Sequence, residues 1–96
     1  MPVHVLLDAK IKPQAQQALS TFIQENLANV RGFNGCRKVD VLFNLEKDTL
    51  LLDEIWQSPD HHQAYIASIA ESGVMEQLVS YLQAPPNVQY FEMADY

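Results

Sequence analysis

The spacing of apolar residues switches between the period of a strand and the period of a helix, and the order of these switches restricts the fold more than any other feature. Residues 2–11 alternate, with Val3, Val5 and Leu7 on one side, which is typical of a strand. Residues 13–29 carry apolar side chains three or four positions apart, which predicts a helix that begins near Pro13. Two glycines in residues 32–35 then favour a turn.

The second part of the chain continues the alternation of periods. Residues 36–45 and 49–57 read as two strands joined by a short polar turn, so we expect a hairpin. Ser58 suits the N-cap of a helix and Pro59 its first position, which predicts a helix over residues 59–71. After Ser72 and Gly73, apolar residues resume helical spacing over residues 74–82. Two prolines then end the helical region, and residues 88–94 read as a last strand.

The resulting order is β-α-β-β-α-β, which predicts an α+β fold of the ferredoxin-like class. Its sheet has four antiparallel strands, and both helices pack on one face. The 96 residues are 48% hydrophobic and 19% charged, a balance that argues against disorder. We therefore expect residues 1–96 to form a single domain.

Both faces of the predicted sheet are apolar. Strand 49–57 places Leu50 and Leu52 on one side and Leu51 and Ile55 on the other, and strand 36–45 sets Leu42 opposite Val39, Val41 and Phe43. Helices on one face leave the other exposed, and soluble monomers rarely expose so large an apolar patch. We therefore expect a homodimer that joins sheet to sheet around a two-fold axis.

Charge restricts the possible partners, and the cysteine content restricts the possible cellular location. Residues 1–48 hold all six Lys and Arg and five of the acids, whereas residues 49–96 hold seven acids and no Lys or Arg. Without a clustered basic face, nucleic acid and anionic membranes are not expected partners. No apolar run is long enough to span a membrane. Cys36 is the one cysteine, which suits a reducing compartment, and we expect a cytoplasmic location.

Two short motifs resemble those of the antibiotic biosynthesis monooxygenase family, which belongs to the dimeric α/β-barrel superfamily. One is Glu54-Ile55-Trp56-Gln57-Ser58-Pro59 followed by Tyr65-Ile66-Ala67-Ser68, and the other is Phe33-Asn34-Gly35-Cys36. The resemblance implies a ferredoxin-like fold, dimerisation through the sheet into an α/β barrel, and a pocket between sheet and helices. Characterised members of the family include cofactor-free oxygenases of phenols and quinols and haem-degrading enzymes. A histidine of the family falls at Tyr65 here, and a second one is absent, so roles resting on those histidines are not carried over.

Helix 59–71 carries the catalytic candidates. His62, Tyr65, Ile66 and Ile69 are spaced three or four apart, so they share one face that looks toward the sheet. His62 can accept a phenolic proton at neutral pH, and Tyr65 can donate a hydrogen bond to a developing oxyanion. The alternative for His62 is a partly exposed residue bonded to the backbone at the helix start, and Tyr65 can equally be an ordinary buried tyrosine.

The strands carry the candidates for substrate binding. Trp56 is either a flat wall for a planar substrate or part of the core. Glu54 lies on the same strand face, where it can accept a hydrogen bond in the cavity, although an ion pair with Arg37 or Lys38 is the favoured interpretation. We expect Phe43, on the corresponding face of strand 36–45, to contact the substrate as well.

The sequence predicts neither a metal nor an organic cofactor. His61 and His62 diverge by about 100° on a helix, and neither has a metal-binding side chain four residues on. Together with the helix-face geometry, the family resemblance implies a cofactor-independent monooxygenase acting on a small aromatic quinol or phenol. The alternatives are a non-enzymatic dimer that binds a small molecule or responds to stress, and a haem-degrading relative.

Overall fold

The computed structural model describes residues 2–96, and its elements follow the predicted order. A sheet strand comes first, then a helix, two strands, two consecutive helices and a final strand. Their bounds are β1 (Val3–Lys10), α1 (Gln16–Arg31), β2 (Cys36–Phe43), β3 (Thr49–Trp56), α2 (Pro59–Ser72), α3 (Val74–Ser80) and β4 (Asn87–Phe91).

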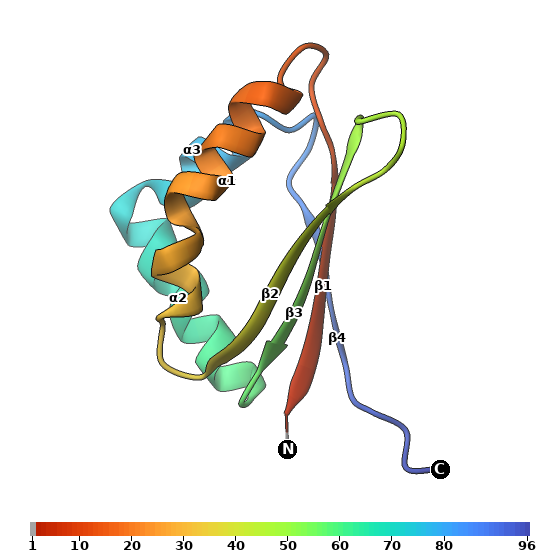
Figure 1. The fold of residues 1–96 in the computed structure, drawn as a ribbon. Coiled ribbons are helices and arrows are strands. Elements are labelled where there is room, and N and C mark those ends of the chain that lie inside the picture. The colour runs from red at the N-terminus through yellow and green to blue at the C-terminus, as the bar shows by residue number, and fades with distance from the viewer. Residues whose placement is uncertain (1) are drawn as a thin grey trace.

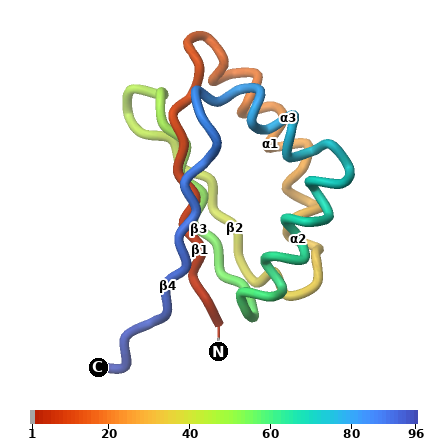
Figure 2. Tube along the Cα trace, turned by 180° about the vertical axis from the view of Figure 1, so that it is seen from behind, coloured from red at the N-terminus to blue at the C-terminus, as the bar shows by residue number. Residues whose placement is uncertain are grey.

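The strands form one sheet in the order β2-β3-β1-β4, and every neighbouring pair is antiparallel. The three helices lie on one face of this sheet, and the opposite face is left open (Figure 1). Seen from behind, β4 follows β1 along the edge, and the last residues run away from the sheet (Figure 2). These observations confirm the predicted ferredoxin-like α+β fold.

The two element boundaries that differ most from the prediction do so for identifiable reasons. Helix α1 begins at Gln16 rather than near Pro13, because Gln14 has a left-handed φ of 65° that cannot continue a helix. Strand β4 ends at Phe91 rather than at residue 94. Phe91 pairs with His4, which lies one residue from the start of β1, so β1 has almost no backbone left to pair with later residues.

The core lies between the helices and the sheet and has two parts. One part joins β1 and β3 to α1 and α3 through residues such as Leu7, Leu19, Leu50 and Leu78. The other surrounds Trp56 at the far end of β3 and includes Val3, Val5, Val30 and Val39. Leu19, Leu50 and Trp56 have no solvent exposure. The second part of the core supports the candidate site.

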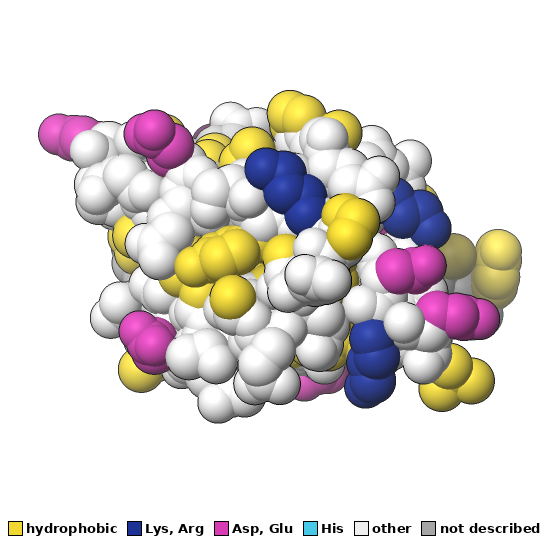
Figure 3. All heavy atoms as spheres, turned by 90° about the horizontal axis from the view of Figure 1, so that it is seen from above, with side chains coloured by type: hydrophobic (Ala, Val, Ile, Leu, Met, Phe, Trp, Pro, Cys, Tyr) yellow, Lys and Arg dark blue, Asp and Glu magenta, His cyan; other side chains and the backbone are white. Residues whose placement is uncertain are grey.

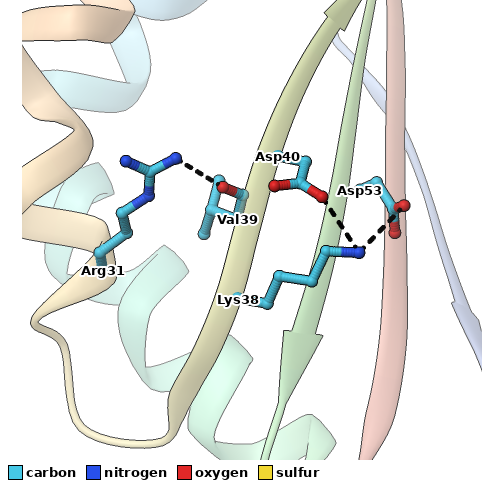
Figure 4. A network of polar contacts seen from close by, with 5 residues as sticks. All are labelled: Arg31, Lys38, Val39, Asp40 and Asp53. Atoms are coloured by element: carbon cyan, nitrogen blue, oxygen red, sulfur yellow. Dashed lines mark hydrogen bonds and ion pairs between the residues drawn. The ribbon is translucent and has the colours of Figure 1, made fainter.

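The open face of the sheet mixes apolar and charged side chains. Leu42 is 45% exposed, Phe91 46% and Met93 71%. Lys38 on the same face lies 3.1 Å from a carboxylate oxygen of Asp40 and 3.5 Å from one of Asp53 (Figure 4). Because a second chain is not part of this structure, the sheet-to-sheet dimer stays a prediction.

The surface seen from above carries no cluster of basic groups. Lys and Arg side chains on this face stand apart from one another, with acidic and hydrophobic groups between them (Figure 3). Across residues 2–96, no helix combines the length and the hydropathy that a membrane span requires.

Candidate active site

The start of helix α2 directs His62 toward the sheet. Ser58 is the N-cap, its Oγ accepts a hydrogen bond from the backbone N–H of His61 at 3.2 Å, and Pro59 occupies the first turn. The imidazole of His61 turns back to Ser58 at 2.6 Å, whereas His62 points into the protein and is only 2% exposed. The predicted inward orientation of His62 is confirmed.

His62 is the centre of a buried polar chain that joins three elements. Its Nδ1 lies 2.7 Å from the hydroxyl of Tyr90 on β4, and its Nε2 lies 3.9 Å from Oε1 of Glu54 on β3. The same Oε1 accepts a 2.7 Å hydrogen bond from the indole N–H of Trp56. A carboxyl oxygen beside Nε2 favours a proton on that nitrogen, which leaves Nδ1 as the acceptor of the Tyr90 hydroxyl proton.

Aromatic rings hold this chain in place. The Trp56 ring packs against His62 with centroids 5.3 Å apart and against Tyr65 at 5.4 Å. Phe33 closes the group from the turn after α1, edge-on to both Trp56 and Tyr65. Such offset and edge-on pairs add favourable contact beyond simple burial. The imidazole therefore has little freedom to rotate.

Burial controls the protonation of the site. Desolvation lowers the pKa of His62 to about 4, so the imidazole is neutral at physiological pH and can accept a proton. Burial raises the pKa of Glu54, with Asp53 adding to the effect and the Trp56 hydrogen bond opposing it. Burial also raises the pKa of Tyr65 to about 12, with Glu54 and Cys36 contributing. Tyr65 is therefore a protonated phenol at neutral pH and can donate a hydrogen bond.

Two spaces adjoin His62. One is a cavity of about 70 Å³ between the helices and the sheet, which Glu54 and Tyr65 also line. The other is a groove of about 410 Å³ between β4 and helices α2 and α3, with Tyr90 in its wall. His62 borders both spaces, as do Leu7, Ile66 and Met75. The imidazole therefore lies at the boundary between a smaller space and a larger one.

The structure brings some predicted site residues together and separates others. His62, Tyr65, Glu54 and Trp56 form one contiguous group. Trp56 has no exposed surface and packs against its neighbours in the core. Phe43 lies apart, lining a shallow hollow between α1 and β2 with residues such as Ile23 and Leu27. The substrate contacts expected of Trp56, Glu54 and Phe43 stay predictions.

The predicted ion pair of Glu54 with Arg37 or Lys38 is wrong. Glu54 faces the helices, where its partners are Trp56 and His62. Lys38 lies on the opposite face and pairs with Asp40 and Asp53 (Figure 4). The register irregularity in β2 lies between Cys36 and Lys38, and from Lys38 to Phe43 the strand pairs regularly with β3. Lys38 therefore alternates with Val39 and shares the open face with Leu42, away from Glu54.

Tyr90 is a site residue that the sequence pattern did not reveal. Alternation in residues 88–94 puts Tyr90 on the face opposite Phe91 and Met93, but alternation alone does not say which face of the sheet that is. Tyr90 pairs with Val5, which belongs to the buried face of β1. Because opposed residues in an antiparallel pair share a face, Tyr90 also lies on the face that the helices cover. The register of β1 with β4 is therefore the signal that would have placed Tyr90 near His62.

The described residues offer no obvious metal centre. No group of three or more His, Cys, Asp or Glu within residues 2–96 is arranged to hold a metal ion. For haem, His62 would have to supply an axial nitrogen. Its Nδ1 is engaged by Tyr90 and its Nε2 faces Glu54 behind the protein surface, so this histidine does not fit an axial ligand. What the arrangement can do is accept a proton on a neutral imidazole held between a phenol and a carboxyl group.

Comparison of the sequence with protein families gives one match. The family model described as antibiotic biosynthesis monooxygenase matches residues 2–70. This range contains β1, α1, β2, β3 and most of α2, and thus Glu54, Trp56, His62 and Tyr65, but it ends before Tyr90. No functionally curated protein matches the sequence with significance.

Comparison of the fold with solved structures gives many matches. Rv0793 from Mycobacterium tuberculosis has a TM-score of 0.85 at 23% identity, with 100% of this chain and 98% of that chain covered. A conserved protein from Methanosarcina mazei has a TM-score of 0.87 at 17% identity, with coverage of 98% and 94%. A monooxygenase from the gene ActVA-Orf6 of Streptomyces coelicolor, in complex with the ligand nanaomycin D, has a TM-score of 0.81 at 14% identity, with coverage of 98% and 88%. At these identities the likeness establishes a shared fold.

Proposed function

Because the chain belongs to the antibiotic biosynthesis monooxygenase family, we propose that it is a monooxygenase that uses neither metal nor flavin and oxidises a small aromatic quinol or phenol. The observation that carries this proposal is the neutral, 2% exposed His62 held between Glu54 and Tyr90 at the boundary of two spaces. A buried neutral base is what removal of a phenolic proton requires, and the resulting electron-rich anion can react with dioxygen.

In the proposed reaction His62 takes the proton and Glu54 stabilises the imidazolium that forms. The Nε2–Oε1 separation of 3.9 Å is short enough for a carboxylate to attract the new charge strongly in a buried site. Trp56 holds Glu54 through its indole N–H and packs on the imidazole. Tyr65, which lines the small cavity, donates a hydrogen bond to negative charge on oxygen as dioxygen is reduced.

The reaction balances without an added reductant when the substrate supplies all the electrons. A hydroquinone and dioxygen give a hydroxyquinone and water, which is a four-electron oxidation of the ring. One oxygen atom enters the product and the other leaves as water. The low pKa of His62 makes it a weak base, which removes a proton more readily from an acidic phenol than from an ordinary one. We therefore propose quinols with electron-withdrawing or extended aromatic rings as the best substrates.

Oxygen consumption tests this proposal. With a panel of hydroquinones, the protein should consume oxygen well above the uncatalysed rate. The variant His62→Gln keeps a polar side chain but removes the base, and its kcat/KM should fall by about 100-fold or more. His61→Gln is the matched control, because the neighbouring imidazole faces Ser58 instead of the site. Equal activity of the two variants would exclude His62 as the base.

A ligand-binding protein without turnover is the second candidate. The observation that favours it is Tyr65, which stands where the family has a histidine and whose pKa of about 12 prevents it from acting as a base at neutral pH. Trp56 reports binding, since it is the one tryptophan of the chain and contacts His62. Fluorescence quenching by quinones in the absence of oxygen consumption would favour this candidate over the enzyme.

We also propose that the working form is a cytoplasmic homodimer whose partner covers the open face of the sheet. Leu42 and Phe91 on that face are nearly half exposed, and Met93 is more so, which supports burial against a second copy. Leu42→Glu should convert the dimer to a monomer in light scattering after gel filtration. Val88→Glu, on the other face of the sheet, is the matched control and should stay dimeric. A wild-type protein that is monomeric at high concentration would contradict this proposal.

A further inference from the structure

Tyr90 occupies a position that the proposed reaction has not yet used. Strand β4 lies at the edge of the sheet (Figure 2), and Tyr90 is 39% exposed there. Its hydroxyl nevertheless lies 2.7 Å from Nδ1 of His62, and the two rings meet edge to face with centroids 5.4 Å apart. Tyr90 therefore connects solvent-accessible space with a base that is itself almost fully buried.

The size of the two spaces decides from which side a substrate ring can approach. An apolar cavity of about 150 Å³ binds benzene in a protein interior, and the smaller space measures only about 70 Å³. The groove beside β4 measures about 410 Å³, which accommodates a bicyclic ring. A substrate in the groove approaches His62 from the side on which Tyr90 covers Nδ1. The route from substrate to base on this side passes the Tyr90 hydroxyl.

The walls of the groove specify the class of ligand. Most are apolar, and polar side chains come from His62, Gln63 and Tyr90. The apolar walls are Leu7, Ile66, Met75, Val79, Pro85, Pro86 and Val88. Within residues 2–96, no Lys or Arg lines the groove, so an anionic ligand would find no counter-charge among these side chains. The groove suits a neutral, flat, apolar ring that presents a hydroxyl group toward Tyr90.

The hydroxyl of Tyr90 can serve two partners at once. A phenol has one proton to donate and lone pairs to accept. While Tyr90 donates to Nδ1 of His62, its oxygen can accept a hydrogen bond from a hydroxyl group in the groove. This is the arrangement required for transfer of a proton through an intermediate hydroxyl.

Building on the proposed function, we propose that Tyr90 is a catalytic residue that contacts the substrate hydroxyl in the groove and relays its proton to His62. The substrate O–H bond breaks as its proton joins the Tyr90 oxygen, and the Tyr90 O–H bond breaks as its proton joins Nδ1. The products are the substrate phenolate, an unchanged Tyr90 and the imidazolium of His62 beside Glu54. No oxidant is consumed in this step, because dioxygen enters afterwards.

The variant Tyr90→Phe tests the relay, since it removes the hydroxyl and keeps the ring. Its kcat with the best hydroquinone should fall by about 100-fold, whereas the Kd for 1,4-naphthoquinone should change by less than about threefold. Tyr81→Phe is the matched control and should keep wild-type kcat, because Tyr81 packs on Phe22 away from the groove. A merely structural role would change Kd and the urea midpoint instead. An unchanged kcat in Tyr90→Phe, with His62→Gln inactive, would overturn the relay and leave the proposed function standing.

A second comparison tests the groove without turnover. Val88→Glu places a charge in the groove at an exposed strand position, and the Kd for 1,4-naphthoquinone, read from Trp56 fluorescence, should rise at least about tenfold. Gln77→Glu adds the same charge on α3 away from the groove and should not change Kd. Equal affinities in the two variants, or no binding to the wild type, would overturn the groove assignment. Binding that follows the groove in a protein that oxidises no quinol would instead overturn the proposed function.

Discussion

The burial of His62 should make the free energy of unfolding of this protein depend on pH. Its folded-state pKa is about 4, and an unfolded histidine has a pKa of about 6.5. Between these values the unfolded chain binds more protons than the folded chain, so the free energy of unfolding falls as the pH is lowered. This contribution is fully present above about pH 6.5 and is lost progressively toward about pH 4.

The expected size follows from the two pKa values. Lowering the pH from 7.5 to 5.0 should remove about 2 kcal/mol of stability through His62, and the full effect below pH 4 is about 3 kcal/mol. The groups that face the imidazole are Glu54 from β3 and Tyr90 from β4, with Trp56 and Tyr65 packed nearby. The raised pKa of Glu54 acts in the opposite sense, because a folded state that retains a proton gains stability as the pH falls.

Urea unfolding at pH 7.5 and pH 5.0, followed by Trp56 fluorescence at one protein concentration, measures this contribution. The loss of stability between the two pH values should be about 2 kcal/mol larger in the wild type than in His62→Gln. The Glu54 carboxyl and the other two histidines remain in both proteins, so their effects largely cancel. An equal loss in both proteins would show that His62 titrates normally in the folded state, which would refute the argument from burial.

Other consequences can be measured with the same protein. Glu54→Gln keeps an acceptor for the Trp56 indole but replaces the ionisable carboxyl beside Nε2 by a neutral amide, so kcat should fall by about tenfold or more with little change in quinone affinity. An unchanged kcat would exclude Glu54 from stabilising the imidazolium. Because the base is neutral above about pH 4, kcat/KM should stay level from pH 8 to about pH 5.5, whereas a base with the ordinary pKa would lose half its activity near pH 6.5. Gly35 and Gly73 both have φ near 90°, but only a Cβ added at Gly35 would meet an imidazole ring, at 2.5 Å. Gly35→Ala should therefore destabilise the protein more than Gly73→Ala. The Gly73 variant measures the left-handed strain alone, about 1–2 kcal/mol, and equal urea midpoints would show that the ring moves aside.

Much of the fold could be predicted because the decisive patterns are local. The alternation of Val3, Val5 and Leu7 and the stripe that includes Leu19 and Phe22 each report on their own element, and the structure places all five in the core. The two boundaries that were most wrong depend on features that the spacing of apolar residues does not report. Helix α1 starts late because of the backbone conformation at Gln14, and β4 stops where its partner strand runs out.

The site was only partly predictable for the same physical reason. The inward face of α2 follows from helical spacing, so His62 and Tyr65 could be found. The contact of Glu54 with His62 could not, because the two residues lie on different elements and meet only where α2 packs on the sheet. Tyr90 is 28 residues from His62 and reaches it only through the pairing of β4 with β1. Contacts set by register between distant strands leave little trace in the spacing of one strand.

The fate of isotopically labelled dioxygen tests the central claim most directly. Turnover of a hydroquinone under ¹⁸O₂ by the wild-type protein should give a hydroxyquinone that carries one ¹⁸O atom, with the second atom in water and no accumulation of hydrogen peroxide. The rate of labelling should fall in step with kcat in His62→Gln. A quinone without label, formed together with peroxide at a rate that His62→Gln does not change, would contradict the assignment of this chain as a monooxygenase that uses His62.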